Sequence, residues 1–147
     1  MSKHNGKNPF AKQQPKTGKH VRGPAVAAST DGVTIAWHLS TIDKDGPFGW
    51  CHVGQSCYWD RIHQKLASFE TMTWNDIVKG SHPVELKDLS KEARKRLEEI
   101  QQDDIESLYS LRLTGTERIW GIRDRNFLKV LWWDPNHKVC PSNKRNT

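Results

Sequence analysis

Three side chains near the C-terminus of this sequence suit work on phosphate groups: Arg118, His137 and Lys138. An arginine can stabilise negative charge that builds on a phosphate oxygen, and a histidine can transfer a proton near neutral pH. Cleavage of RNA by attack of its own 2′-hydroxyl needs these two functions. The stretch from Leu111 to Asn143, which is basic and rich in tryptophan, is therefore the candidate working surface.

The elements that would position these side chains are two consecutive strands. Residues 118–123 and 127–133 each read as a strand, and the residues between them read as a turn. Proline ends the second strand at Pro135 because it cannot donate a ladder hydrogen bond. The start of one antiparallel strand lies beside the end of the next, so we expect Arg118 and His137 to be neighbours although nineteen residues separate them.

The sequence leaves simpler interpretations of these residues open. Arg118 could pair with Asp134 or Glu117, and His137 could do no more than cap a turn. Cys140 follows His137 by three residues and could act as a nucleophile, although nothing in the sequence orients the histidine toward it.

The rest of the chain predicts an α+β fold. Alternating apolar residues predict a strand over 33–39, and apolar spacings of three and four predict an amphipathic helix over 59–69. A short helical turn is expected over 73–78, a helix over 89–100 with Ser90 as its N-cap, and a further strand over 108–113. The expected order is β-α-α(-α)-β-β-β, a small antiparallel sheet with the helices packed on one face.

The charge is unevenly distributed along the 147 residues, whose net charge is +6. Residues 1–22 carry six bases and no acid, 31–110 carry nine bases and fourteen acids, and 111–147 carry eight bases and three acids. We expect residues 1–30 to form a disordered basic tail and residues 31–147 to form a single α+β domain. This asymmetry favours an anionic partner at one end of the molecule.

Composition excludes several other classes of protein. No apolar run reaches the roughly 18 residues of a membrane helix, and no secretory signal or membrane association is expected. The three cysteines, Cys51, Cys57 and Cys140, have neither a disulfide pattern nor standard zinc-ligand spacing. We therefore predict a cytoplasmic protein with no metal and no cofactor.

Seven tryptophans are many for this length. Trp37, Trp59, Trp120 and one of the adjacent pair Trp132 and Trp133 fit core positions. Neighbouring residues of a strand face opposite sides, so the other member of the pair is expected to be exposed. Trp133 is the candidate for stacking on a nucleic-acid base.

The segment from Arg112 to Ile122, the strand residues 128–131 and the late His137 resemble the C-terminal half of YoeB-type toxins of the RelE/ParE superfamily. The resemblance implies a metal-independent endoribonuclease that acts on mRNA, on the ribosome, and that has a cognate antitoxin. It implies that Arg118 stabilises the phosphate and that His137 is the terminal catalytic histidine. Under this hypothesis Arg112, Arg123 and Lys138 hold the RNA backbone.

A second hypothesis belongs to a different class of protein. The segment from Leu131 to His137 also resembles an uncharacterised bacterial family. That resemblance allows a module that binds nucleic acid or a protein at the same sheet edge without catalysis.

Overall fold

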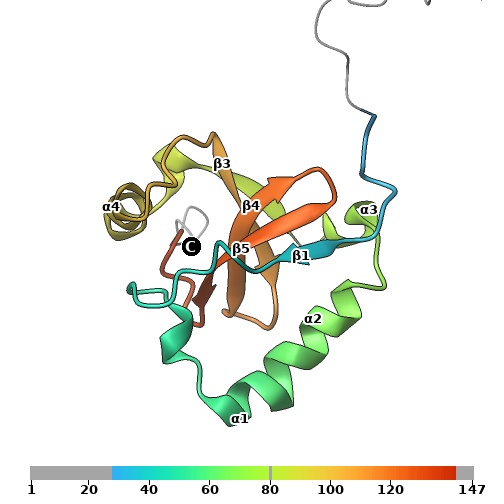
Figure 1. The fold of residues 1–147 in the computed structure, drawn as a ribbon, viewed down its shortest axis with the longest axis horizontal. Helices are drawn as coiled ribbons and strands as arrows, with labels where there is room; N and C mark the ends of the chain where they lie inside the picture. Colours follow the sequence, from blue (N-terminus) through green and yellow to red (C-terminus); the bar gives the residue numbers. More distant parts are fainter. Residues whose placement is uncertain (1–27, 80, 142–147) are drawn as a thin grey trace, which may run out of the picture.

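One five-stranded mixed sheet organises the protein, as shown by a computed structural model that describes residues 28–79 and 81–141. The strand order is β1-β5-β4-β3-β2 (Figure 1). The strands are β1 (Ala36–His38), β2 (His82–Glu85), β3 (Ser107–Arg112), β4 (Arg118–Asp124) and β5 (Phe127–Asp134). β1 is parallel to β5, and every other neighbouring pair is antiparallel.

The helical segments join β1 to β2 and β2 to β3. The helices are α1 (Gln55–Cys57), α2 (His63–Phe69), α3 (Trp74–Ile77) and α4 (Lys91–Glu99), with a π-helical turn η2 (Tyr58–Ile62) between α1 and α2. Single 3₁₀ turns lie at Trp50–His52 and Leu86–Asp88. Thr73 caps α3 in a capping box, and the Ser90 hydroxyl caps α4 by accepting from the Ala93 amide.

The α+β class and the three consecutive strands β3, β4 and β5 agree with the prediction from sequence, but the antiparallel sheet does not. β1 is shorter than expected, and it pairs with β5 in parallel, so the sheet is mixed. The sequence did not predict β2, which contains Pro83. β2 is an edge strand, where a proline is tolerated since one side of the strand needs no ladder donor. Residues 1–27 of the predicted tail lie outside the described residues.

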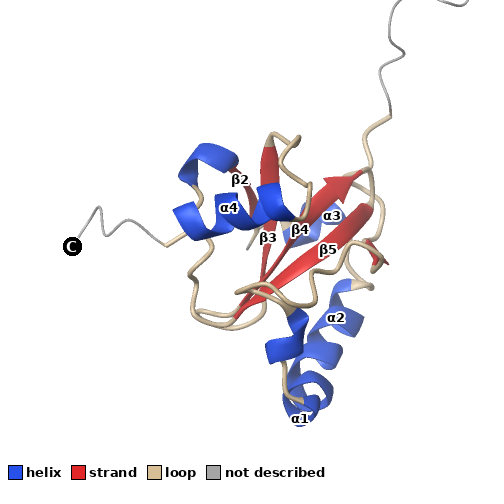
Figure 2. Ribbon diagram, turned by 60° about the vertical axis from the view of Figure 1, so that its left-hand side comes forward, coloured by secondary structure: helices blue, strands red, loops and turns tan. Residues whose placement is uncertain are grey.

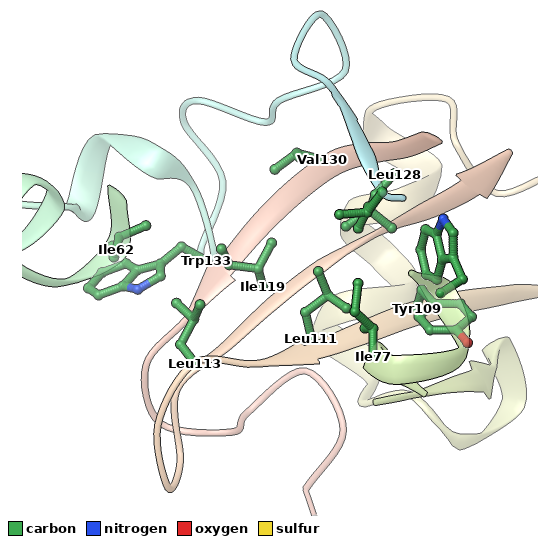
Figure 3. Close-up of a cluster of buried hydrophobic side chains, with 11 residues drawn as sticks. Ile62, Ile77, Tyr109, Leu111, Leu113, Ile119, Leu128, Val130 and Trp133 are labelled. Atoms are coloured by element: carbon green, nitrogen blue, oxygen red, sulfur yellow. The ribbon is translucent and has the colours of Figure 1, made fainter. Parts of the chain in front are cut away.

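The expectation that all helices pack on one face is wrong. The buried side chains form two clusters, one on each face of the sheet. In the first, which we call the α2 cluster, Ile62 and the α3 residues Trp74 and Ile77 pack against β3, β4 and β5 (Figure 3). Helix α4 lies on the other face (Figure 2), where its residues Ala93 and Leu97 belong to the second cluster, which we call the α4 cluster. The near-continuous apolar run in β5 is typical of a strand that is buried on both faces.

The tryptophan predictions are partly confirmed. Trp120 is 1% exposed, and Trp132 and Trp133 belong to opposite clusters, as adjacent strand residues should. However, both members of the pair are buried, because each face of the sheet carries a helical layer. Trp133 lies beside Ile62 in the α2 cluster (Figure 3) and is 9% exposed, so the expectation of an exposed tryptophan there is wrong. Trp59, expected in the core, is 55% exposed.

A buried ion pair joins the loop after β1 to α4. The Asp43 carboxylate accepts two hydrogen bonds from Arg96, at 2.7 and 2.8 Å, and one from the Trp132 indole at 2.9 Å. Asp43 is 6% exposed. The hydrogen bonds from Arg96 hold the pKa of the Asp43 carboxyl below its ordinary value, against the opposing effect of burial.

Replacing Arg96 with methionine is expected to lower the free energy of unfolding by about 3 kcal/mol, because the buried Asp43 carboxylate loses its counterion.

The pKa of Asp43 is lowered on folding, so its charge contributes stability above the unfolded pKa of about 3.9. This contribution is lost as the pH falls through the lower folded value. Urea unfolding across that pH range should show the difference between the wild type and Asp43→Asn shrinking toward acid.

Glu99 provides the matched control, because its carboxylate also accepts a hydrogen bond from Arg96, at 2.9 Å, but it is solvent-exposed. Glu99→Gln should change the free energy of unfolding by less than about 0.5 kcal/mol. Equal losses for Arg96→Met and Glu99→Gln would show that the buried pair has no special importance.

Candidate nucleic-acid site

A cavity of about 300 Å³ opens beside β2, β3 and β4, and most of its polar lining is cationic. We call it the cationic cavity. Its basic lining residues are Lys79, His82, Arg112, Arg118 and His137. The remaining lining residues are Val78, Ser81, Ser110, Trp120 and Cys140. No acidic residue lines the cavity within the described part of the chain.

The sheet register explains why these residues meet. His82 on β2 pairs with Ser110 on β3, and Ser110 pairs with Trp120 on β4. Arg112 and Arg118, two positions further along β3 and β4, form the next pair on the same face. Because alternate residues of a strand share a face, both rows lie on the face of Trp120, which is the side covered by α4.

Arg118 is buried, with 8% of its surface exposed, and its guanidinium is held by the backbone. Its Nη1 donates to the carbonyl oxygens of Thr114 and Gly115 at 2.9 Å and to its neighbouring carbonyl, that of Glu117, at 3.0 Å. No ion pair of Arg118 occurs among the described residues. Burial, together with the positive charge of Arg112, lowers the pKa of the Arg118 guanidinium, and Asp134 opposes this shift.

The two carboxylates that sequence offered as partners of Arg118 are bound elsewhere. Asp134 accepts hydrogen bonds from the Trp120 indole at 3.2 Å and from the backbone amides of Lys138 and Val139 at 2.9 Å. Glu117, buried with 2% exposure, accepts from Arg61 at 2.9 Å and from the Trp133 indole at 2.8 Å. Both acids therefore bond to other groups, and among the described residues Arg118 has no bonded counterion.

His137 lies in the turn that follows β5, in a left-handed backbone conformation with φ of 57°. This conformation is uncommon for a residue with a side chain. The Asp134 carboxylate fixes the turn, and the Thr116 hydroxyl donates to the Pro135 carbonyl at 2.9 Å. The Nδ1 atom of His137 is buried and has no hydrogen-bond partner within residues 28–79 and 81–141. A buried nitrogen without a partner and a left-handed backbone each call for an explanation, and a functional role is one that experiment can test.

The structure brings together three of the six residues that sequence assigned to the site: Arg112, Arg118 and His137. Arg118 and His137, which we expected to be neighbours, line the same cavity. Lys138 is exposed and lines an adjacent cavity of about 190 Å³, which Trp133 also lines. Trp133 is buried against Glu117, so its ring is not available for base stacking in this conformation.

Arg123 does not belong to the cationic cavity. It lies near the other end of β4, where its guanidinium bonds to Asp31 at 2.6 Å. Its Cζ also lies 4.1 Å from the centre of a Trp74 ring. Such a cation–π contact, combined with an ion pair, is a structural role in the α2 cluster.

Sequence reasoning missed Lys79 and His82, which also line the cationic cavity. The sequence predicts a helical turn over 73–78 and no strand in the segment that follows it, so nothing placed these two residues beside β3. A short polar segment flanked by glycine and proline gives little signal for an edge strand.

Cysteine chemistry gains no support in the cavity. All three cysteines are free. The Cys140 thiol donates to the Asp88 carbonyl at 3.3 Å, and burial raises the pKa of this thiol, which disfavours the reactive thiolate. Among residues 28–79 and 81–141, no group of three or more His, Cys, Asp or Glu side chains could hold a metal ion.

Two further observations bear on the class of protein. Within the described residues, no helix has both the length and the apolar character needed to cross a membrane. The chain matches no protein-family model, no curated protein and no solved structure, so its resemblance to the RelE/ParE superfamily stays a prediction.

Proposed function

We propose that this protein is a metal-independent endoribonuclease that binds and cleaves RNA in the cationic cavity. Arg118 stabilises negative charge on the phosphate in the transition state, and His137 transfers a proton. Arg112 and Lys79 attract the RNA backbone into the cavity. The observation that carries the proposal is the buried Arg118, which has no bonded carboxylate among the residues that the structure describes, in a cavity lined by further basic residues.

The electrostatics of the cavity favour an anionic ligand. A buried charge is costly unless it is paired, and the ion pairs of the described residues do not include Arg118. The three backbone carbonyls at Nη1 orient the guanidinium without neutralising it. A planar guanidinium held in this way suits a phosphate, whose oxygens it can bind at two points.

The choice of RNA rests on the chemistry of the available groups. RNA supplies its own nucleophile, the 2′-hydroxyl, so the protein needs to supply only proton transfer and charge stabilisation. His137 and Arg118 line one cavity and offer these two functions. In keeping with the resemblance to YoeB-type toxins, the proposed substrate is mRNA on the ribosome in the cytoplasm. The proposed partner is an antitoxin whose acidic residues cover the cationic cavity.

Induced expression of the full chain tests the proposal in cells. We expect growth arrest and transcripts with new cut ends, both relieved by Arg118→Ala and by His137→Ala. The purified wild type should cut RNA, free or on ribosomes, in the presence of a metal chelator. Harmless expression together with uncut RNA would refute the nuclease, and RNA binding without cutting would support the non-catalytic module instead.

A further inference from the structure

We propose that His82 is a second proton-transfer residue, which acts together with His137 in the cationic cavity. This inference rests on the proposed endoribonuclease function and adds a catalytic residue to it. Both imidazoles line the same cavity, although one comes from an edge strand and the other from the turn after β5.

The two histidines reach the cavity from different elements. β2 carries His82, β3 carries Arg112, β4 carries Arg118, and β5 leads into the turn with His137. His137 follows the end of β5 by three residues, and the turn that carries it brings it to the cavity that His82 also lines. Both guanidiniums, those of Arg112 and Arg118, line the same cavity.

In-line cleavage of RNA needs proton transfer on both sides of the phosphorus. On one side a neutral imidazole takes the proton of the 2′-hydroxyl while the 2′-oxygen forms a bond to phosphorus. On the other side the bond from phosphorus to the 5′-oxygen breaks, and an imidazolium donates its proton to that oxygen. The products are a 2′,3′-cyclic phosphate and a 5′-hydroxyl, and the proton count is balanced. One histidine cannot reach both oxygens at once.

His82 is the side chain of the cavity that suits the second role. The other titratable groups lining the cavity with His82 are Lys79, Arg112, Arg118, His137 and Cys140. Lysine and arginine hold their protons near neutral pH, and burial raises the pKa of the Cys140 thiol, so none of these is a ready base. An imidazole can both accept and donate a proton near neutral pH.

Two glutamine variants and a modified substrate test the pairing. His82→Gln and His137→Gln should each lower the cleavage rate of an RNA with a mapped cut site by about 10²–10⁴-fold. In a second substrate, sulfur replaces the bridging 5′-oxygen at that site, which gives a leaving group that needs no proton. This substrate should restore the rate of one variant, the one that lacks the acid, and not of the other.

Two controls separate catalysis from binding and folding. Affinity for an uncleavable 2′-O-methyl RNA should change little in His82→Gln. His38→Gln is the matched control, because His38 is an exposed histidine on β1, the opposite edge strand, and does not line the cavity. It should cleave at the wild-type rate, and thermal unfolding should show that all three variants are folded.

The outcomes distinguish failure of this inference from failure of the proposed function. If the wild type cuts no RNA, free or on ribosomes, the proposed function fails. If the wild type cuts RNA and His82→Gln cuts it equally fast, only the role of His82 fails. Rescue of both variants by the sulfur substrate, or of neither, would overturn the assignment of one acid and one base to the two histidines.

Discussion

Replacing Arg118 with lysine is expected to lower the rate of RNA cleavage by about 10²–10³-fold, as loss of one transition-state donor does in other enzymes. Lysine keeps the positive charge but offers a single ammonium group. In the wild type, Nη1 donates to the carbonyl oxygens of Thr114, Gly115 and Glu117, and the other guanidinium nitrogens are left to bind a phosphate. A single ammonium group cannot bind the carbonyls and the phosphate together, so Arg118→Lys should lower kcat much more than it raises KM.

Arg112 and Arg123 provide controls for this prediction. Arg112→Lys should lower the rate of RNA cleavage by less than about tenfold, because Arg112 is exposed and contributes mainly electrostatic attraction. Arg123→Lys should lower stability rather than the rate, since Arg123 pairs with Asp31 away from the cavity. Steady-state kinetics with a mapped RNA and urea unfolding of each variant measure these effects. A wild-type kcat in Arg118→Lys would remove Arg118 from the mechanism.

The regular part of the fold could be predicted because local patterns decide it. β3, β4 and β5 follow one another with short turns, and a short turn between two apolar runs determines antiparallel pairing. α4 was predictable for the same reason, since Ser90 and the apolar spacing of its helix mark it within a few residues.

The rest of the fold depends on contacts between distant parts of the chain. The parallel pairing of β1 with β5 joins Trp37 to Leu128, and no local turn specifies it. In β5, a register shift opposite Trp120 and Gly121 leaves Leu131 without a paired residue in β4 and aligns Trp132 with Trp120. This bulge puts the consecutive residues Leu131 and Trp132 in the same cluster, which a simple two-residue alternation does not predict.

The part of the candidate site that could be predicted from sequence is the part that strand pairing determines. Arg118 and His137 share a cavity because the start of β4 pairs with the end of β5, and Arg118 lies opposite Asp134. Arg123 was assigned to the same site because it is basic and close in sequence. Its actual partner, Asp31, is 92 residues away, so no local pattern could reveal the ion pair.

The wrong expectation for Trp133 has a similar cause. Its indole donates to a buried carboxylate, that of Glu117, which also binds Arg61 from the helical segment 55–69. Sequence offered Glu117 as a partner of Arg118, its chain neighbour. Only the packing of that helical segment on the sheet redirects the carboxylate, and this packing also covers the tryptophan.

Replacing His137 with glycine is expected to separate activity from stability. The change should lower RNA cleavage by about 10²–10⁴-fold, because it removes the proposed proton-transfer group. Yet the free energy of unfolding should stay within about 1 kcal/mol of the wild type. Glycine adopts the left-handed conformation of residue 137 without strain, which offsets the greater freedom it gives the unfolded chain. The change also removes the unpaired Nδ1.

Arg125 supplies the matched control for this prediction. It has nearly the same backbone conformation, with φ of 58°, in the exposed turn between β4 and β5, away from the cationic cavity. Arg125→Gly should therefore relieve similar strain with no loss of cleavage. Rates on a mapped RNA and urea unfolding of both variants make the comparison. If His137→Gly loses activity only in proportion to a loss of folded protein, the imidazole is structural; a large rate loss in a fully folded variant is the result that the proposed chemistry requires.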